Sequence, residues 1–284
     1  RTGIPNPTWT AFYEGVQPSK STRAQVEDTT GMLENWTQID ERLYNITKDK
    51  AQFRLQEASS VLEGFAQEIE QTIFYGNVNS APREFHGLSP RFNSTTAGNG
   101  NQIISGGGTG SDNTSIWFIT TGPTTCGLLY PQGTTSGIAR NDIGVETYQD
   151  SNGALIRYLR EQFMAHIGFY LADWRYVSRV ANIDVSNLAT GSATDLYDKM
   201  ITAFYKLQNR KGTMAFSMDG ASPVQIKPMI FCNTKIKEYL HKQMRTNSNT
   251  YLNLREVAGE EVMTFLGMQI VETDGITDTE ATVS

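Results

Sequence analysis

The chain has 284 residues, of which 38% are hydrophobic and only 19% are charged, and its formal net charge at pH 7 is −6. This length is enough for one large domain or two modest domains with a real hydrophobic core. The acidic balance argues against a dedicated nucleic-acid-binding protein, which needs clustered Lys and Arg to neutralise phosphates. No apolar run approaches the ~20 residues of a membrane span, so we expect no membrane association.

Residues 1–48 lack the apolar pattern of a packed domain. The stretches Trp9–Val16 and Thr22–Thr29 are joined by Gln17-Pro18-Ser19-Lys20, which predicts a long hairpin with its turn at these four residues. A hairpin that cannot bury its side chains is marginal in water. We therefore expect it to lie on a neighbouring molecule, with an ordinary surface hairpin as the alternative.

A long amphipathic helix is predicted over Lys50–Tyr75, because apolar residues recur there every three or four positions. About 25 residues make a rod of roughly 37 Å, more than twice the mean helix length. The helix is expected to end at Gly76, where the backbone can turn left-handed at little cost. A rod with one apolar stripe is expected to lie across a sheet.

Residues 93–114 are rich in Gly, Ser, Thr and Asn. They do not form a phosphate-binding loop, because no Gly-Lys-Ser/Thr follows the glycines. We expect a mobile surface loop or the tip of a long hairpin. From Ser115 the apolar period changes to two, which predicts strands at Ile116–Thr121, Gly127–Tyr130, Leu155–Asp173 and Trp174–Ile183.

The last third of the chain alternates helices and strands. A helix is predicted from Ser192 or Thr194 to near Gly212. The strand Met229–Cys232 then leads into a second helix that begins after Asn233 or Thr234.

The chain closes with a predicted strand over Val262–Val271, which contains Gly267, and with a polar tail from Thr273 that we expect to be exposed. Neither an internal repeat nor a linker between modules is evident. These features predict one intertwined α+β unit with two lobes.

No catalytic, cofactor-binding or metal site is indicated by the sequence. His86, His166 and His241 lie far apart, and none has a Ser or Cys in a recognised nucleophile context. Cys126 and Cys232 lack the spacing of metal ligands and are expected to be two buried free thiols. The sequence therefore indicates a protein that is not an enzyme.

The densest cluster of interaction-prone side chains is Asp173-Trp174-Arg175-Tyr176. Arginine and aromatic residues are enriched at subunit interfaces, which is the interpretation we prefer. A carbohydrate-stacking platform is the competing interpretation. Four arginines with acidic and apolar neighbours are expected to form ion pairs: Arg157, Arg160, Arg175 and Arg179.

Four blocks of sequence share a further pattern. They are Pro7-Thr8-Trp9 with Tyr13–Ser21 and Thr30–Glu34; Phe74–Asn77 with Phe85, Gly87-Leu88 and Arg91; Ser115–Trp117 with Gly122-Pro123, Gly127, Tyr130–Gly133 and Gly137; and Ile167-Gly168 with Asp173–Val177 and Arg179–Asp184. This pattern resembles the major capsid proteins of tailed bacteriophages, and more narrowly the group from short-tailed phages related to epsilon15. The blocks cover most of the chain in the order of that family.

The resemblance implies an α+β, HK97-like capsid fold. Residues 1–48 would be an extended intersubunit hairpin loop, and residues 49–190 a β-sheet peripheral domain with Lys50–Tyr75 as its spine helix and the strands of residues 115–185 as its long sheet. Residues 191–284 would form an axial α/β lobe and the C-terminal tail. The hairpin, the helix and the strands follow from the residue pattern, whereas the capsid rests on the resemblance.

The implied function is that of a structural major capsid protein without a cofactor. Copies would assemble into the hexamers and pentamers of an icosahedral shell, through heterologous contacts that close into rings. The shell would enclose double-stranded DNA without sequence-specific binding, and the acidic composition would keep the wall from holding that DNA tightly. The other implied partners are portal and scaffold proteins and a decoration protein, and the implied location is the virion capsid, after assembly in the host bacterium's cytoplasm.

The residues expected at subunit interfaces lie in the predicted loop and in the aromatic cluster. They are Trp9, Tyr13, Lys20, Arg23, Glu27, Asp28, Asp173, Trp174, Arg175 and Tyr176. Charged loop residues would pair across subunits, each exposed pair contributing at most about 1 kcal/mol. Lys20 lies near the expected loop tip, where some members of the wider fold form Lys–Asn isopeptide bonds. No matching Asn or catalytic Glu is evident here, so we prefer a salt-bridging lysine.

Two other classes compete with the phage shell. An encapsulin-like cargo compartment uses the same fold, but the long loop and the four sequence blocks favour the phage protein. A β-rich carbohydrate-binding or hydrolysing protein would use Trp36, Trp117 and Trp174 with neighbouring carboxylates, and it predicts a monomer with affinity for glycans.

Overall fold

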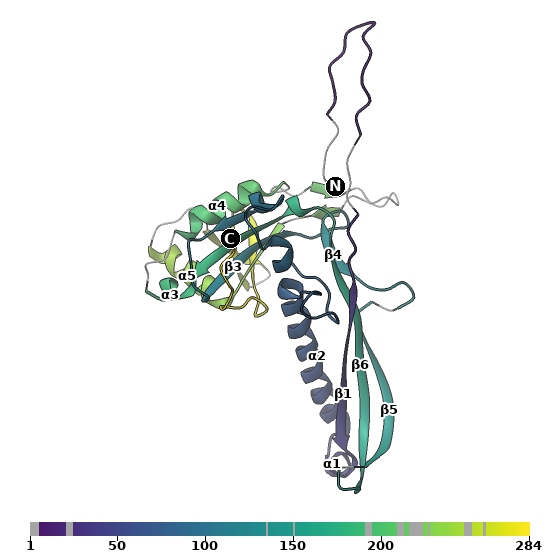
Figure 1. Cartoon of the computed structure of the whole chain (residues 1–284). Coiled ribbons are helices and arrows are strands. Elements are labelled where there is room, and N and C mark those ends of the chain that lie inside the picture. Colours follow the sequence, from purple (N-terminus) through teal and green to yellow (C-terminus); the bar gives the residue numbers. More distant parts are fainter. Residues whose placement is uncertain are drawn as a thin grey trace.

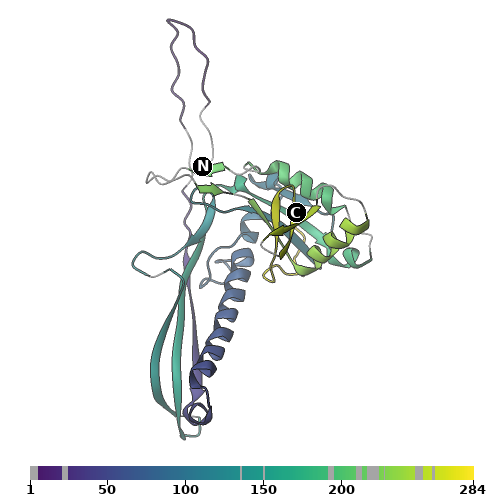
Figure 2. The same ribbon diagram turned by 180° about the vertical axis from the view of Figure 1, so that it is seen from behind.

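The computed structural model describes residues 6–20, 25–134, 136–149, 151–190, 195–208, 213–215, 224–226, 228–246, 252–257 and 260–284. These residues form a broad head built on a seven-stranded sheet and a narrow arm built on one long helix and long strands (Figure 1 and Figure 2). Helices and strands are thoroughly mixed along the chain, so the α+β prediction is confirmed.

The long helix of the arm, α2, runs over Lys50–Tyr75 as predicted. Its first turn is capped by Asp49, whose carboxylate accepts a hydrogen bond from the backbone N–H of Gln52 at 3.0 Å. The helix does end at Gly76, but the expected left-handed turn is wrong, because Gly76 has φ −48°. A glycine fits there for a different reason: a Cβ atom would collide with the carbonyl oxygen of Phe85.

The arm sheet is centred on the long strand β6, Leu155–Leu171, which pairs antiparallel with β1, β4 and β5. The bounds of the remaining arm elements are β1 Thr30–Asp40, α1 Glu41–Ile46, β4 Cys126–Leu129 and β5 Ile138–Gln149. Strand β5 was not predicted from the sequence. Its burial pattern explains why, since eleven of its twelve residues are exposed and no alternation of apolar side chains marks it.

The head sheet has the strand order β11-β12-β13-β10-β3-β7-β2. The strands are β2 Ile103–Ser105, β3 Asn113–Thr120, β7 Val177–Asp184, β10 Pro228–Cys232, β11 Leu252–Val257, β12 Glu260–Phe265 and β13 Met268–Glu272. The head helices are α3 Val185–Thr190, α4 Leu196–Lys206 and α5 Thr234–Thr246, and a separate two-stranded sheet pairs β8 Thr213–Ala215 with β9 Val224–Ile226.

Strand β3 lies at the centre of the head and has core on both faces. Ile116 and Phe118 face the cluster built with α4 and α5, whereas Trp117 and Ile119 face a second cluster that includes Phe74 at the end of α2. Successive side chains of a strand point to opposite faces, so this alternation follows from the backbone. The end of α2 is therefore part of the head core, while the rest of the helix extends along the arm (Figure 1).

Several sequence expectations are corrected by the structure. The strands of residues 115–185 were expected in one sheet, but β3 and β7 join the head sheet while β4, β5 and β6 form the arm sheet. The strand predicted from Trp174 begins at Val177, after a short 3-10 helix over Trp174–Tyr176. The single strand predicted over Val262–Val271 is a hairpin, because Leu266 and Gly267 both have positive φ and reverse the chain.

The glycine-rich region and the C-terminal tail were also expected to be more exposed than they are. The region contains the buried strand β2, and Gly106 packs so closely that a Cβ atom would lie 2.7 Å from the carbonyl oxygen of Asn182. In the tail, Ile276 and Glu280 are buried. Tertiary partners far away in sequence bury both segments, which local composition does not reveal.

Two other expectations concern the cysteines and the first helix of the head. Cys126 and Cys232 are buried free thiols, as predicted. The helix predicted from Ser192 or Thr194 to near Gly212 is α4, but the predicted ends are wrong, because Asp195 caps its start and it ends at Lys206. Ser192, Thr194 and Gly212 themselves lie outside the described residues. Among the residues that are described, no helix combines the length and hydropathy needed to cross a bilayer, and no group of three or more His, Cys, Asp or Glu side chains is arranged to hold a metal ion.

Candidate assembly interface

The N-terminal loop of residues 6–20 extends away from the rest of the molecule (Figure 1). Its large side chains have no cover, since Trp9, Phe12 and Tyr13 are 100%, 98% and 109% exposed. Soluble proteins rarely present adjacent aromatic side chains to water without an interaction that uses them. The loop thus has the chemistry of a contact surface, and these three side chains are not packed against the described part of the chain.

The predicted hairpin turn of the loop is misplaced by several residues. The chain reverses at Phe12 and Tyr13, where Tyr13 has φ +69° and the N–H of Glu14 donates to the carbonyl oxygen of Ala11 at 3.3 Å. Gln17-Pro18 are therefore not the turn, although proline is a common turn residue. Lys20 is therefore remote from the tip, which weakens the interpretation of Lys20 as a cross-linking residue.

Asp28 anchors the root of the loop on its own chain. Its carboxylate pairs with the Arg91 guanidinium at 2.7 Å, and both side chains are largely buried. Arg91 also donates to the carbonyl oxygen of Gly87 at 3.1 Å. Pairing across subunits thus stays a prediction for Lys20 and Glu27, whereas Asp28 already has an intrachain partner; Arg23 lies outside the described residues.

The cluster Asp173–Tyr176 stabilises its own chain. The Asp173 carboxylate accepts hydrogen bonds from the Arg175 backbone and guanidinium at 2.7–3.2 Å, and this ion pair raises the pKa of Arg175. Asp173 is buried, and Trp174 packs against the second head cluster. These contacts account for Asp173, Trp174 and Arg175 locally, and the role of the four residues at a subunit interface stays a prediction.

The face of the arm sheet that points away from α2, here called the outer face, carries a second group of aromatic residues. The Arg160 guanidinium lies 5.7 Å from the ring centre of Trp36 and 5.8 Å from that of Tyr148, and it pairs with Glu146 at 3.1 Å. Trp36 and Tyr148 are 41% and 51% exposed. Sequence reasoning expected an ion pair for Arg160 but missed this arrangement, because it depends on the unpredicted strand β5.

An ionic cluster on the inner side of the arm sheet joins α2 to β5 and β6. Glu161 accepts hydrogen bonds from Arg54 at 2.6 Å and from Arg140 at 2.8 and 2.9 Å, and Arg54 also pairs with Asp142 at 2.6 Å. Burial alone raises the pKa of the Glu161 carboxyl, but the two guanidinium groups outweigh it and leave the pKa below its usual value. Glu161 is therefore ionised at neutral pH and holds the arm together.

An exposed aromatic loop, a long helix on a narrow sheet and an α/β head define the class of HK97-like shell proteins. The chain belongs to the major capsid protein GP7 family, whose family model matches residues 1–284. The prediction of a tailed-phage major capsid protein with an HK97-like fold is thereby confirmed, and the protein is a structural component of a virion capsid shell. The cargo-compartment and carbohydrate-protein alternatives are not favoured.

One solved structure agrees with the family. The chain is similar over its whole length to a chain in the structure of bacteriophage epsilon15, with 31% sequence identity, coverage of 83% of that chain and a TM-score of 0.67. A chain from the capsid of an empty GTA particle is much more distant, with 10% identity over 63% of this chain and 82% of that chain and a TM-score of 0.35. Among curated proteins, none matches the chain.

Proposed function

We propose that copies of this protein form the hexamers and pentamers of an icosahedral shell, with residues 6–20 of each copy lying on its neighbour. The observation that carries this proposal is the complete exposure of Trp9, Phe12 and Tyr13 on a loop that projects from the molecule. Burying such side chains stabilises a contact by about 1.5–3 kcal/mol each. Repeated around a closed ring, a modest contact of this kind is sufficient for stable assembly.

The outer face supplies a suitable surface for such a loop. It carries the guanidinium of Arg160 between Trp36 and Tyr148, and guanidinium and aromatic groups pack well against further aromatic rings. Lys20 and Glu27 are the charged loop residues that would pair at the rim of the contact. Asp173–Tyr176 would serve a second interface only through the parts of these side chains that remain accessible.

The proposed content of the shell is double-stranded DNA, held without sequence-specific binding. The net charge of −6 supports a wall that does not grip phosphates, because each neutralised phosphate would add affinity and hinder filling and release. Portal and scaffold proteins and a decoration protein are the proposed partners, and the bacterial cytoplasm is the proposed place of assembly. These partners follow from the family's biology and have no assigned contact in this chain.

A double substitution of the loop tests the proposal. Trp9→Ser with Tyr13→Ser removes two aromatic rings from a segment that contributes nothing to the subunit's own core, so thermal unfolding of the subunit is expected to be unchanged. Shell yield, measured by sedimentation and negative-stain electron microscopy, is expected to fall by at least about ten-fold, the effect of losing about 1.4 kcal/mol per contact.

The matched control is Trp9→Phe with Tyr13→Phe, which keeps the apolar area of the loop. This control is expected to assemble like the natural protein. If the serine variant assembled equally well, the loop would not be an intersubunit contact, and the proposal would be wrong on that point.

A further inference from the structure

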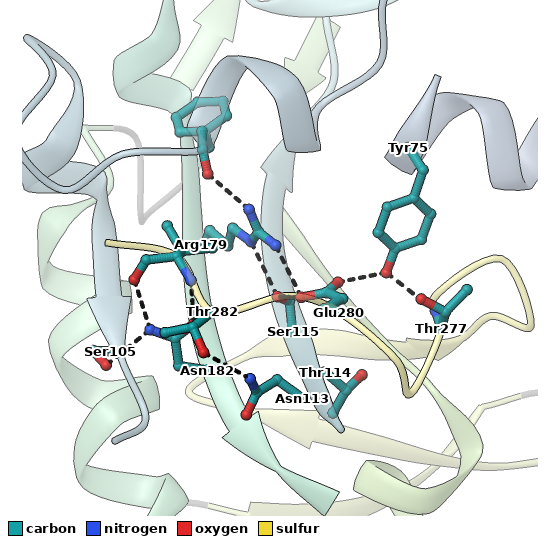
Figure 3. Close-up of polar contacts among 12 residues, drawn as sticks. Tyr75, Ser105, Asn113, Thr114, Ser115, Arg179, Asn182, Thr277, Glu280 and Thr282 are labelled. Carbon is teal, nitrogen blue, oxygen red and sulfur yellow. Dashed lines mark hydrogen bonds and ion pairs between the residues drawn. The ribbon is translucent and has the colours of Figure 1, made fainter. Parts of the chain in front are cut away.

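Residues 273–283, here called the strap, tie the end of α2 to the head sheet. On the side of the sheet, the backbone N–H of Glu280 donates to the carbonyl oxygen of Asn113 at 2.9 Å. Further along, Asn182 and Val283 exchange two hydrogen bonds at 2.8 and 2.9 Å (Figure 3). The strap is thus fixed to both β3 and β7.

Glu280 is the centre of the buried polar cluster in Figure 3. One carboxylate oxygen pairs with the Arg179 guanidinium at 2.9 Å and also accepts a hydrogen bond from the Ser115 hydroxyl. Arg179 is held in turn by the carbonyl oxygen of Phe92 at 2.7 Å and lies 4.8 Å from the ring centre of Trp117. With Arg179 only 1% exposed, this half of the cluster is a fixed point of the head.

The other oxygen of Glu280 accepts a hydrogen bond from the hydroxyl of Tyr75, the last residue of α2. The same hydroxyl accepts a hydrogen bond from the backbone N–H of Thr277 at 3.1 Å. Burial and the charge of Glu280 raise the pKa of Tyr75, so the hydroxyl remains a donor at all physiological pH values. The Tyr75 hydroxyl therefore connects the helix to the strap through two hydrogen bonds, one donated and one accepted.

A second contact between α2 and the strap lies more than one helical turn earlier. The hydroxyl of Thr273 donates to the Glu70 carboxylate. Gly275 packs against the same turn so closely that a Cβ atom would lie 2.7 Å from Cγ of Glu70 and 3.0 Å from its backbone carbonyl carbon. Two points of attachment along a helix define its direction, which a single point does not.

The geometry of the arm amplifies any change at this junction. Twenty-six helical residues at 1.5 Å each span about 39 Å, so a rotation of one degree at Tyr75 moves the far end of α2 by about 0.7 Å. The apolar contact of Phe74 with Trp117, 6.2 Å between ring centres, locates the helix end. Apolar packing is not directional, however, whereas hydrogen bonds are, so the polar contacts fix the angle.

We infer that Tyr75 and Glu280 are positioning residues that set the angle between arm and head, and through it the curvature at which copies close into a shell. The inference rests on the proposed assembly into a shell, and it assigns the control of shell size to these two residues. If the angle between arm and head changes within each copy, the angle between neighbouring copies changes too. A loosened junction is therefore expected to give particles of mixed or altered diameter.

The first test measures the angle in the isolated subunit and does not depend on assembly. Spin labels at Ser60→Cys on α2 and Thr202→Cys on α4 report the distance between arm and head, because both positions are exposed and the natural thiols are buried. Tyr75→Phe removes only the connecting hydroxyl. It is expected to broaden or shift the distance distribution, since a rotation of about 5° moves the label at residue 60 by about 2 Å.

Tyr197→Phe is the matched control. It removes a buried hydroxyl that donates to the carbonyl oxygen of Leu240 at 2.9 Å, and both residues belong to the head. It is expected to lower stability by an amount similar to Tyr75→Phe while leaving the distance distribution unchanged. Gly275→Ala is a second variant at the junction, because its added methyl group would push the strap away from α2. It keeps the inference testable if Tyr75→Phe fails to fold.

The second test measures particle diameter by electron microscopy. Each variant is expressed under the conditions, including any portal or scaffold protein, in which the natural chain forms shells. Tyr75→Phe and Gly275→Ala are expected to give a broader or shifted diameter distribution, and Tyr197→Phe the natural one. Natural distances and natural diameters in both junction variants would overturn the inference. If the junction variants altered the distance between the spin labels but even the natural chain formed no shells, the proposed assembly function would be wrong and the positioning role of the junction would stand.

Discussion

Strand β3 of the head and strand β5 of the arm are buried to opposite extents. All eight residues of β3 in the head are buried, whereas eleven of the twelve residues of β5 in the arm are exposed. Strand β3 pairs with β10 and β7 on its two sides and is covered on both faces, whereas β5 pairs with β6 alone and its side chains have little cover. The head completes its own core within one chain, and the arm leaves its surface available to other chains.

The arm's own core is correspondingly small. Four buried residues, Ala58, Phe65, Phe163 and Ala165, form its central cluster, and Leu55 on α2 remains 60% exposed. Where apolar cover is thin, the ionic cluster around Glu161 connects helix and sheet. The comparison predicts that head substitutions alter folding, while most arm substitutions alter assembly.

The largest effect is expected from a cavity in the head. Phe118→Ala removes a fully buried ring from the centre of the sheet and should lower the free energy of unfolding by about 3–5 kcal/mol. Val145→Ala on β5, where the side chain is 43% exposed, should change it by less than about 1 kcal/mol. Chemical denaturation of the subunit measures both, and equal losses would contradict the contrast.

A smaller loss is expected at the ionic cluster of the arm. Glu161→Gln keeps the side-chain shape but leaves Arg54 and Arg140 without their shared carboxylate, and should cost about 1–3 kcal/mol. Because both arginines retain some exposure, water compensates for part of the loss. The change should appear as faster hydrogen exchange in β5 and not in β3; equal acceleration in both strands would argue against a local role.

The same cluster gives a pH dependence of known sign. The folded-state pKa of Glu161 lies below its ordinary 4.5, so its stabilisation is fully present above that value and is lost as the pH falls through the folded-state pKa. The stability difference between the natural chain and Glu161→Gln should therefore shrink in acid. Denaturant titrations at a series of pH values check this, and a difference that grew in acid would show the opposite linkage.

The smallest effect concerns reactivity and leaves stability unchanged. Burial raises the pKa of Cys126 and Cys232 to about 12, so neither thiol should react with a disulfide reagent at neutral pH while the head is folded. A cysteine introduced in the arm by Val145→Cys should react orders of magnitude faster. Rapid labelling of the natural thiols would reveal a head that opens more readily than its core implies.

The sequence predicted the parts of the molecule whose signals are local. Helix α2 was placed at its observed bounds because its apolar residues repeat with the helical period, and the second half of β3 was placed because Ile116–Ile119 form one apolar run. The polar start of β3, from Asn113, was missed. Strand β5 was missed because it is held by backbone pairing to β6, which leaves little trace in residue type.

The candidate site was predicted in part for a similar reason. Trp9 and Tyr13 stand out as apolar residues in a segment without a core, and the structure leaves both exposed. Glu280 looked like an ordinary surface acid, because its partner Arg179 lies 101 positions away and only the folded head brings them together. The turn at Phe12 and Tyr13 carries no glycine or proline that would have marked it.

The order of strands in the head has a consequence for the timing of folding. Strand β3 acquires its neighbours β7 and β10 only after those later segments have been synthesised. Arg179 likewise lacks its carboxylate partner until Glu280 has left the ribosome. Contacts between distant residues form slowly, and an unfinished sheet exposes apolar strands meanwhile. A growing chain therefore cannot present a finished head to its neighbours, which separates synthesis of the subunit from its incorporation into a particle.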